Sequence, residues 1–540
     1  MLLPAPGSLG HVLKTESLCM RYPGSMTWIL DQLDLSLTSG ERIALVGPSG
    51  CGKSTVARVA LQLLPSGSLC KGKLLLAGRD PRQLNPACLR RLRGEAVGLV
   101  FQDPTTRLNP LMTIGEHILD TLKAHRPREN SVWVRQRAEV LLERVGISSA
   151  RFHSYPHEFS GGMRQRLAIA LAIALDPPFV IADEPTTSLD VAIADQVMSE
   201  LSDLCDDMGS ALLLISHDLA LAARWCDRIN IMEKGRIVEE ARSGEFLLSP
   251  QSSIGKRLVS AARAREEGRM TVKSDSELVL EVQRLRCWHA LDGLPWQLRW
   301  LKAVDEVSFS ICSGETLGVV GASGCGKSTL CRALMGLTPI RGGEVKLQGQ
   351  NILNLKGKSL RNARRSLQMV FQDPFASLNP KMTVSEAISD SLLIHNLCSA
   401  TEAREITKVL LKQVGLAPPE NFQNRFPHQL SGGQQQRVAI ARALALEPKV
   451  LICDESVSML DAEIQSEVLE LLKLLQKRLG VAILFITHDL AVATGFCHRV
   501  IVLDQGRIVE EGPGRTLLNF PQSSITKKLV EACPTLPLIN

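Results

Sequence analysis

The segment GPSGCGKST at residues 47–55 follows the apolar run Ile43–Val46, and it returns as GASGCGKST at residues 321–329 after Leu317–Val320. Each copy predicts a buried strand, a glycine-rich loop and the start of a helix. In such a loop, backbone N–H groups converge on phosphate oxygens and the helix start adds its positive dipole end. We therefore expect two loops that bind nucleotide phosphates.

Within each loop the residue types predict separate tasks. Lys53 and Lys327 are expected to reach the β- and γ-phosphates, and the hydroxyls of Ser54 and Ser328 are expected to ligate Mg²⁺. Cys51 and Cys325 are expected to be small fillers. The phosphate-binding residues predicted in this way are Gly47, Pro48, Ser49, Gly50, Cys51, Gly52, Lys53, Ser54 and Thr55, and Gly321, Ala322, Ser323, Gly324, Cys325, Gly326, Lys327, Ser328 and Thr329.

The repeat extends over the whole chain. VFQDPTTRLNP (100–110) matches VFQDPFASLNP (370–380), FSGGMRQR (159–166) matches LSGGQQQR (430–437), and IADEPTTSLD (181–190) matches ICDESVSMLD (452–461). The spacing between matched motifs is nearly constant, for example 271 for Asp183 and Asp454 (454 − 183). A period of this length indicates domain duplication, since solenoid repeats are far shorter. We expect domains at 1–261 and 277–540, joined by a linker at 262–276.

Acidic pairs end a second apolar run in each half. Short apolar runs at 180–182, 212–215, 450–453 and 483–486 alternate with helical patterns, which predicts a parallel α/β sheet. Asp183 and Asp454 at strand ends are expected to hold Mg²⁺, and the next residues, Glu184 and Glu455, to activate the attacking water. A third strand end carries His217 in one half and His488 in the other, and both are expected to contact the γ-phosphate.

These motifs together resemble the ABC ATPase family. The resemblance implies two tandem P-loop (RecA-like) nucleotide-binding domains of the α/β class, each with an α-helical signature subdomain and an antiparallel β subdomain. It implies that Gln102 and Gln372 sense Mg²⁺ and γ-phosphate, and that Tyr22 stacks on adenine. In the second half Trp288 and His289 are alternatives for adenine stacking. The family's SGG signature falls on Ser160, Gly161, Gly162, Ser431, Gly432 and Gly433.

The resemblance also implies an intramolecular head-to-tail pairing of the two domains. Each ATP, with its Mg²⁺, would lie between the phosphate loop of one half and the signature of the other. Site one would join the Lys53 loop to Ser431 and Gly433, and site two the Lys327 loop to Ser160 and Gly162.

Composition excludes several other classes of protein. The net charge of +6 arises from 62 basic and 56 acidic residues without a long basic block, and only 2 Tyr are present. Nucleic acid is therefore not an expected partner. The longest apolar run is Leu167–Leu175, well short of the ~20 residues of a membrane helix, and the first residues lack a secretory pattern. The fourteen Cys contain no C-x-x-C pair, which favours reduced thiols.

The stretches SYPHEFSGGMRQR and RFPHQLSGGQQQR resemble the oligopeptide, dipeptide and nickel importer ATPases. That resemblance implies two transmembrane permease subunits and an extracytoplasmic solute-binding protein as partners. The chain would then lie peripherally on the cytoplasmic face of the inner membrane and energise import of peptides or of nickel and metal chelates. The alternatives are a soluble twin ATPase acting on ribosomes, disfavoured by the short linker, and a DNA-damage sensor, disfavoured by the absence of Cys-rich zinc modules.

Overall fold

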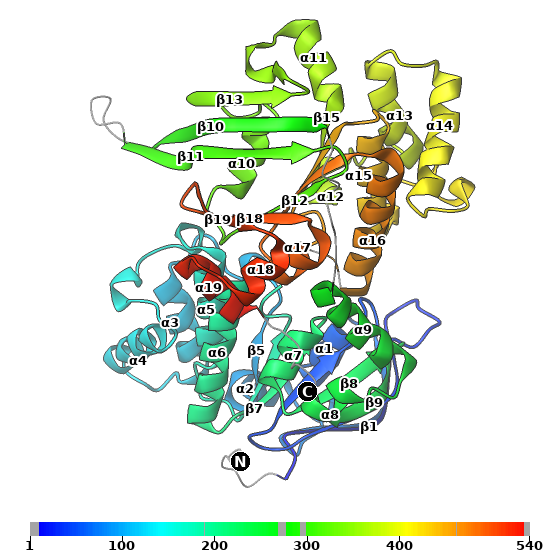
Figure 1. The fold of residues 1–540 in the computed structure, drawn as a ribbon. Coiled ribbons are helices and arrows are strands. Elements are labelled where there is room, and N and C mark those ends of the chain that lie inside the picture. The colour runs from blue at the N-terminus through cyan, green and yellow to red at the C-terminus, as the bar shows by residue number, and fades with distance from the viewer. Residues whose placement is uncertain are drawn as a thin grey trace. The chain divides into compact units, whose positions relative to one another are not determined.

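The computed structural model describes residues 10–187, 189–267, 277–291, 299–458, 460 and 462–533. The chain folds into two compact units, the first mainly Met1–Leu189 with Ile193–Ala262 and the second mainly Arg263–Cys533. Each unit contains one six-stranded sheet, one smaller antiparallel sheet and a group of helices. Figure 1 labels these elements.

The central sheet of the first unit has the strand order β5-β6-β7-β3-β8-β9. Its first five strands are parallel, and β9 pairs antiparallel with β8. Strands β6 and β7 are apolar and almost entirely buried, as expected for parallel strands covered on both faces. The bounds are β3 (Arg42–Val46), β5 (Gly98–Val100), β6 (Phe179–Asp183), β7 (Ala211–Ser216), β8 (Arg228–Glu233) and β9 (Arg236–Arg242).

A second, antiparallel sheet of the first unit has the order β2-β1-β4, with bounds β1 (Leu13–Arg21), β2 (Leu30–Leu37) and β4 (Leu69–Leu76). Buried and exposed residues largely alternate along β2, so one face of the sheet is apolar. That face shares a core with helix α1 (Lys53–Ala60), which follows the first phosphate loop. The antiparallel sheet therefore packs on the helix that the loop begins.

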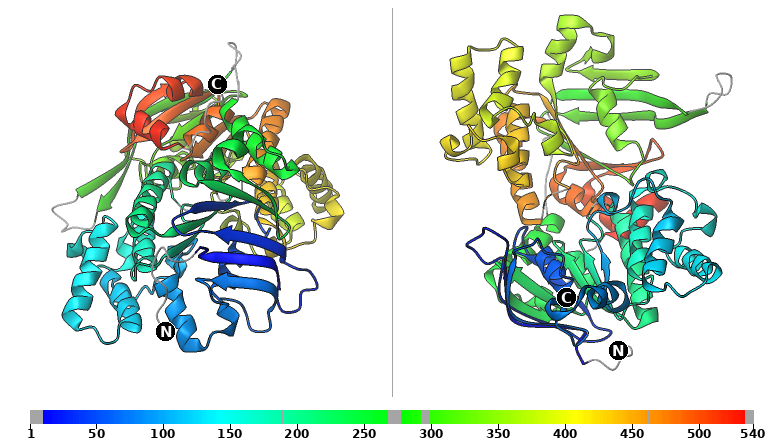
Figure 2. Two further views of the ribbon diagram at one scale, coloured as in Figure 1. Left: turned by 90° about the horizontal axis from the view of Figure 1, so that it is seen from below. Right: turned by 180° about the vertical axis from the view of Figure 1, so that it is seen from behind.

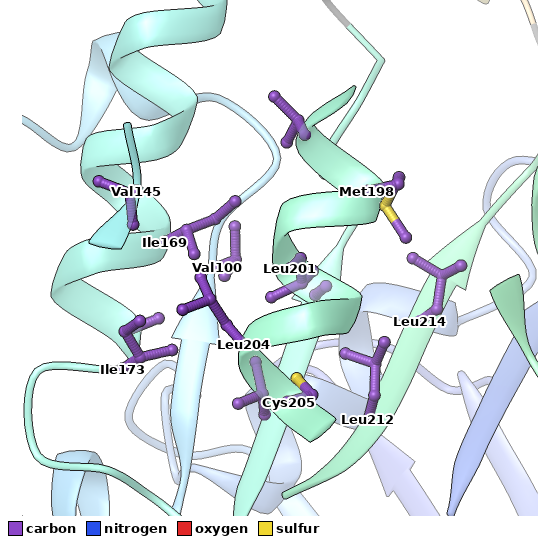
Figure 3. Packing of buried hydrophobic residues seen from close by; sticks show 14 of the residues in the cluster. Val100, Val145, Ile169, Ile173, Met198, Leu201, Leu204, Cys205, Leu212 and Leu214 are labelled. Carbon is purple, nitrogen blue, oxygen red and sulfur yellow. The ribbon is translucent and has the colours of Figure 1, made fainter. Parts of the chain in front are cut away.

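Helices α3 (Ile114–His125), α4 (Ser131–Arg144) and α5 (Gly161–Ala172) form a separate group, visible in cyan in Figures 1 and 2. Thr113 and Glu116 form a capping box at the start of α3, and Ser160 caps α5. Figure 3 shows Ile169 of α5 facing Leu201 of α6 (Val191–Met208), with Leu212 of β7 on the other side of α6 in the same core. The other helices are α2 (Pro86–Arg91), α6 (Val191–Met208), α7 (Leu219–Trp225), α8 (Ser243–Leu248) and α9 (Ser253–Glu267).

The second unit repeats this plan, with sheet orders β15-β16-β17-β12-β18-β19 and β11-β10-β13-β14. The strands are β10 (Leu278–Leu291), β11 (Arg299–Cys312), β12 (Thr316–Val320), β13 (Gly342–Leu347), β14 (Gln350–Asn351), β15 (Leu367–Val370), β16 (Val450–Asp454), β17 (Ala482–Thr487), β18 (Arg499–Asp504) and β19 (Arg507–Gly512). The helices are α10 (Lys327–Leu334), α11 (Gly357–Ser366), α12 (Pro374–Ser377), α13 (Val384–Ile394), α14 (Ala400–Gln413), α15 (Gly432–Leu444), α16 (Ala462–Leu479), α17 (Leu490–Phe496), α18 (Gly514–Asn519) and α19 (Ser524–Ala532).

The predicted fold class is confirmed in both units, including the six strands expected from the apolar runs and the helices expected after GKST and SGG. Helix α9 continues to Glu267, so residues 262–267 of the predicted linker are helical. Residues 268–276 lie outside the described residues, and the predicted domain boundaries stay a prediction. No helix within the described residues is long and apolar enough to cross a membrane.

The strand before each phosphate loop is tied to the start of β8 or β18 by a different side chain in each unit. Thr316 N–H donates to His498 Nδ1 over 2.9 Å, whereas Arg42 N–H donates to the Asp227 carboxylate over 3.1 Å. Burial lowers the pKa of His498 from its ordinary value of 6.5. The folded unit therefore binds this proton more weakly than the unfolded chain, and the stabilisation by neutral His498 is lost as the pH falls below 6.5.

We expect His498→Asn to reduce the acid sensitivity of folding. Once His498 Nδ1 is protonated it becomes a donor that faces the Thr316 N–H donor, and the hydrogen bond between them is lost. This loss lowers the free energy of unfolding by about 1–3 kcal/mol, which corresponds to a fall in Tm of a few degrees. The measurement is the change in Tm between pH 7 and pH 5 for the wild type and the variant. Asp227→Asn is the matched control in the first unit. An equal change in the wild type and in His498→Asn would contradict the expectation.

Candidate functional site

Each phosphate loop follows the carboxyl end of a central strand and packs closely on the neighbouring strand. A Cβ on Gly47 would lie 2.2 Å from the carbonyl oxygen of Met232, and a Cβ on Gly321 would lie 2.2 Å from that of Leu503. Both contacts are with backbone, so a side chain at either position would displace the loop. The two glycines are therefore required by the close approach of the loop to β8 or β18.

The loop lysines are buried although they carry a charge. Lys53 is 5% exposed, and its Nζ donates to the carbonyl oxygens of Gly47 and Pro48 over 2.7 and 3.0 Å. Lys327 is also 5% exposed and makes the same two bonds to Gly321 and Ala322. Glu455 Oε1 also lies 3.9 Å from Lys327 Nζ, beyond hydrogen-bond distance. A buried ammonium whose hydrogen bonds go to neutral carbonyl groups is a costly arrangement, and it fits a site that receives a polyanion.

A serine hydroxyl and an aspartate meet beside each lysine. Ser54 Oγ donates to Asp183 Oδ1 over 2.8 Å, and Ser328 Oγ to Asp454 Oδ1 over 3.5 Å. Burial and the charge of Glu455 raise the pKa of Asp454 to about 6, and burial raises the pKa of Asp183. One carboxylate and one hydroxyl fit Mg²⁺, which takes its remaining ligands from phosphates and water. No cluster of three or more His, Cys, Asp or Glu that could hold another metal occurs in the described part of the chain.

The adjacent glutamate of the first unit receives donors from three segments. Gln102 Nε2 donates to Glu184 Oε2 over 2.8 Å, and His217 Nδ1 lies 3.5 Å from Oε1. Burial would raise the pKa of Glu184, but the hydrogen bond and charge of His217 hold it below its ordinary value. Burial would lower the pKa of His217, but Glu184 raises it overall. Thr187 Oγ1 is the third donor, over 3.0 Å.

The second unit assembles the equivalent group. Gln372 Nε2 donates to Glu455 Oε2 over 2.9 Å, and His488 Nδ1 lies 3.6 Å from the same oxygen. Burial would raise the pKa of Glu455, but His488 holds it below its ordinary value. Both glutamates have a left-handed backbone, with φ 48° at Glu184 and 45° at Glu455. Strain of this kind in a non-glycine residue is typical of functional sites.

Thr187 is the site residue that sequence reasoning missed. Its place three residues after Glu184 is the only sequence signal, because a tight turn brings such a residue back to the glutamate. The matching residue of the second unit, Ser458, donates to the main-chain carbonyl of Glu455 over 2.8 Å.

The position that matches Tyr22 in the second unit follows from strand register. Ser17 of β1 and Arg284 of β10 both have positive φ, and each is followed by a buried leucine. Five residues after Ser17 is Tyr22, and five residues after Arg284 is His289. His289 is therefore the residue equivalent to Tyr22, and Trp288 is equivalent to Arg21. Tyr22 OH lies 3.3 Å from Thr55 Oγ1, at the start of α1. The register therefore favours His289, which is exposed, as the counterpart of Tyr22.

The SGG segments begin helices α5 and α15. Ser160 Oγ and Ser431 Oγ accept hydrogen bonds from Met163 N–H and Gln434 N–H. A Cβ on Gly162 would lie 2.4 Å from Ile193 Cγ2, so this glycine is required for packing against α6.

Each unit thus brings together a loop of backbone donors, a buried cation, a Ser–Asp pair and a glutamate held by glutamine and histidine. The loop and the lysine fit the phosphates of a nucleoside triphosphate. The Ser–Asp pair fits Mg²⁺, and an ionised glutamate beside them fits the orientation of a water molecule for phosphoryl transfer. Sequence reasoning predicted all of these residues except Thr187.

Comparison with known proteins gives one family. The family model described as "ABC transporter" matches residues 30–187 and 304–458. Both matched spans contain a phosphate loop, a glutamine and an acidic pair.

Curated relatives match nearly the full chain. A glutathione import ATP-binding protein GsiA of Pectobacterium atrosepticum is 38% identical over 576 residues, covering 99% of this chain and 92% of that protein. The GsiA of Escherichia coli (strain K12) is 38% identical over 564 residues, covering 97% and 90%. Among solved structures, a dimeric post-hydrolysis state of the ATP-binding cassette MJ0796 with ADP and Pi is 32% identical with a TM-score of 0.40, covering 44% of this chain and 99% of that one.

Proposed function

Because this chain belongs to the ABC transporter family of ATP-binding proteins, we propose that it energises an importer with two ATP sites on one polypeptide. It is an ATPase coupled to transport, and the proposal concerns its cargo, its partners and the residues that act. The observation that carries it is the assembly of the same loop, lysine, Ser–Asp pair, Gln and Glu in both units.

The proposed roles follow from charge and position. Lys53 and Lys327 exchange their hydrogen bonds to the loop carbonyls for bonds to the β- and γ-phosphates and so neutralise phosphate charge. The proposed Mg²⁺ ligands are Ser54, Asp183 and Gln102 in the first unit and Ser328, Asp454 and Gln372 in the second. When bound, Mg²⁺ supplies neutralisation of phosphate charge. Glu184 and Glu455 take a proton from the attacking water, while His217 and His488 keep these carboxylates ionised and contact the γ-phosphate.

The pairing of the two units is proposed from the family resemblance alone. In that pairing Ser431 and Gly433 complete the site of Lys53, and Ser160 and Gly162 complete the site of Lys327. A serine hydroxyl and free N–H groups at a helix start suit the γ-phosphate. Tyr22 and His289 are proposed to lie against the adenine ring.

For cargo we propose a small peptide. The named cargo of the curated relatives is glutathione, which is a peptide, and this supports the peptide branch. Nickel or a metal chelate stays the alternative from the motif resemblance. The proposed partners are two transmembrane permeases and an extracytoplasmic solute-binding protein, with this chain peripheral on the cytoplasmic face of the inner membrane. A soluble ATPase acting on ribosomes is the competing function.

Purification of the chain from its own cell in mild detergent, followed by mass spectrometry, tests this proposal. We expect two multi-span permeases to copurify. Labelled glutathione, dipeptides and nickel chelates would then be offered to cells with and without the chain, and we expect loss of uptake for a peptide. Recovery of ribosomal proteins without a membrane partner would overturn the transport proposal and leave the ATPase assignment intact.

A further inference from the structure

Two hydroxyl residues at matching positions make different contacts in the two units. Thr187 Oγ1 donates to the Glu184 carboxylate over 3.0 Å, and Thr187 N–H donates to the Glu184 carbonyl oxygen over 3.4 Å in the same turn. The second donor to that carboxylate oxygen, Gln102, comes from the loop after β5. Thr187 is therefore a local support whose position is fixed by the same turn as the glutamate.

Among the described residues of the second unit, no side chain of the same turn donates to the Glu455 carboxylate. Ser458 Oγ donates to the main-chain carbonyl oxygen of Glu455 over 2.8 Å and so does not reach the carboxylate. The groups around that carboxylate are Gln372 Nε2 at 2.9 Å, His488 Nδ1 at 3.6 Å and Lys327 Nζ at 3.9 Å.

The distinction matters once the site is occupied. The two glutamines, the two histidines and Lys327 all have proposed duties toward Mg²⁺ or phosphate, so their contacts with the glutamates compete with those duties. Thr187 has no such duty. A carboxylate at the end of a flexible side chain gains most from a donor that stays in place through the reaction.

We propose that Thr187 is a positioning residue for Glu184, and that the second site works without an equivalent. The inference rests on the role proposed above for Glu184. It makes the two ATP sites chemically unequal although their phosphate loops are alike.

The test isolates each site in the full-length chain. In a Glu455→Gln background, single-turnover hydrolysis of γ-labelled ATP reports the first site, and affinity for a fluorescent ATP analogue is measured in parallel. We expect Thr187→Val to lower the hydrolysis rate about tenfold or more, the value of one hydrogen bond to a charged group, without changing affinity. Thr187→Ser should restore the rate. Thr187→Ala is the second variant without a hydroxyl should valine disturb the fold, and melting curves accompany each variant.

The matched control is Ser458→Ala in a Glu184→Gln background, where we expect an unchanged rate. Equal losses in Thr187→Val and Thr187→Ser would indicate a packing role and overturn the inference. Unchanged rates in Thr187→Val and Thr187→Ala would overturn it as well. If Glu184→Gln with Glu455→Gln hydrolyses ATP normally, the site assignment itself fails, which distinguishes that failure from a failure of the Thr187 inference alone.

Discussion

A chain carrying both Glu184→Gln and Glu455→Gln is expected to bind Mg·ATP normally and to hydrolyse it about 10²–10⁴-fold more slowly, the usual contribution of a general base. Glutamine keeps the size of the side chain and its hydrogen bonds but cannot accept the proton of water. In the structure each carboxylate lies 3.5–3.6 Å from a histidine that keeps it ionised. The measurement is steady-state phosphate release together with binding of a fluorescent ATP analogue.

Exposed glutamates supply the control for this substitution. Glu139 of α4 and Glu470 of α16 have exposed side chains, at 38% and 66%, and within the described residues each forms an ion pair with a side chain of its own helix. Glu139→Gln with Glu470→Gln should hydrolyse ATP at the wild-type rate. Normal turnover by the Glu184 and Glu455 double variant would contradict the assignment of both residues, whereas loss of ATP binding would indicate that they hold the site together.

The second large effect concerns the buried lysines. Lys53→Met with Lys327→Met is expected to weaken ATP binding on the order of 100-fold, since each lysine offers charge-assisted hydrogen bonds to phosphate. The same variant is expected to keep or raise its Tm, because the substitution removes an ammonium group that is 5% exposed from the nucleotide-free protein. Binding isotherms and melting curves without nucleotide measure the two effects.

Lys73→Met with Lys408→Met is the matched control, since both lysines are surface residues with side chains 50% and 36% exposed. This control should bind ATP as the wild type does. A large fall in the Tm of Lys53→Met with Lys327→Met would contradict the account, because it would make these lysines structural. An unchanged affinity of this variant for ATP would show that the two lysines do not bind the phosphates.

Much of the site could be predicted because its signals are local in sequence. Strand β3, the loop at 47–52 and helix α1 are consecutive. Gly50 and Gly52 have positive φ, and Gly47 approaches the backbone of Met232 too closely for a side chain. The carboxyl ends of parallel strands meet at one edge of a sheet, which is why Asp183 and Ser54 could be expected together. The family motifs added the glutamines.

The rest depends on side-chain geometry that sequence does not specify. Thr187 and Ser458 are both hydroxyl residues three positions after a glutamate, yet they donate to different atoms. The choice between Trp288 and His289 depended on irregular pairing of β10 with its neighbouring strands. These irregularities shift the register of the strand, and no sequence pattern marks the residues at which they occur. His498 and its counterpart Asp227 each accept a hydrogen bond from the first backbone N–H of the strand before the phosphate loop. The two residue types differ, so the sequence does not indicate that they do the same thing.

The central claim is that ATP hydrolysis at these two sites drives import through membrane partners. The most direct measurement is the ATPase rate of the chain in proteoliposomes with its copurified permeases, with and without cargo-loaded solute-binding protein. We expect the loaded binding protein to raise the rate, and the variant with both Glu184→Gln and Glu455→Gln to show no such rise. A rate that is the same with and without the permeases and the loaded binding protein would contradict the claim.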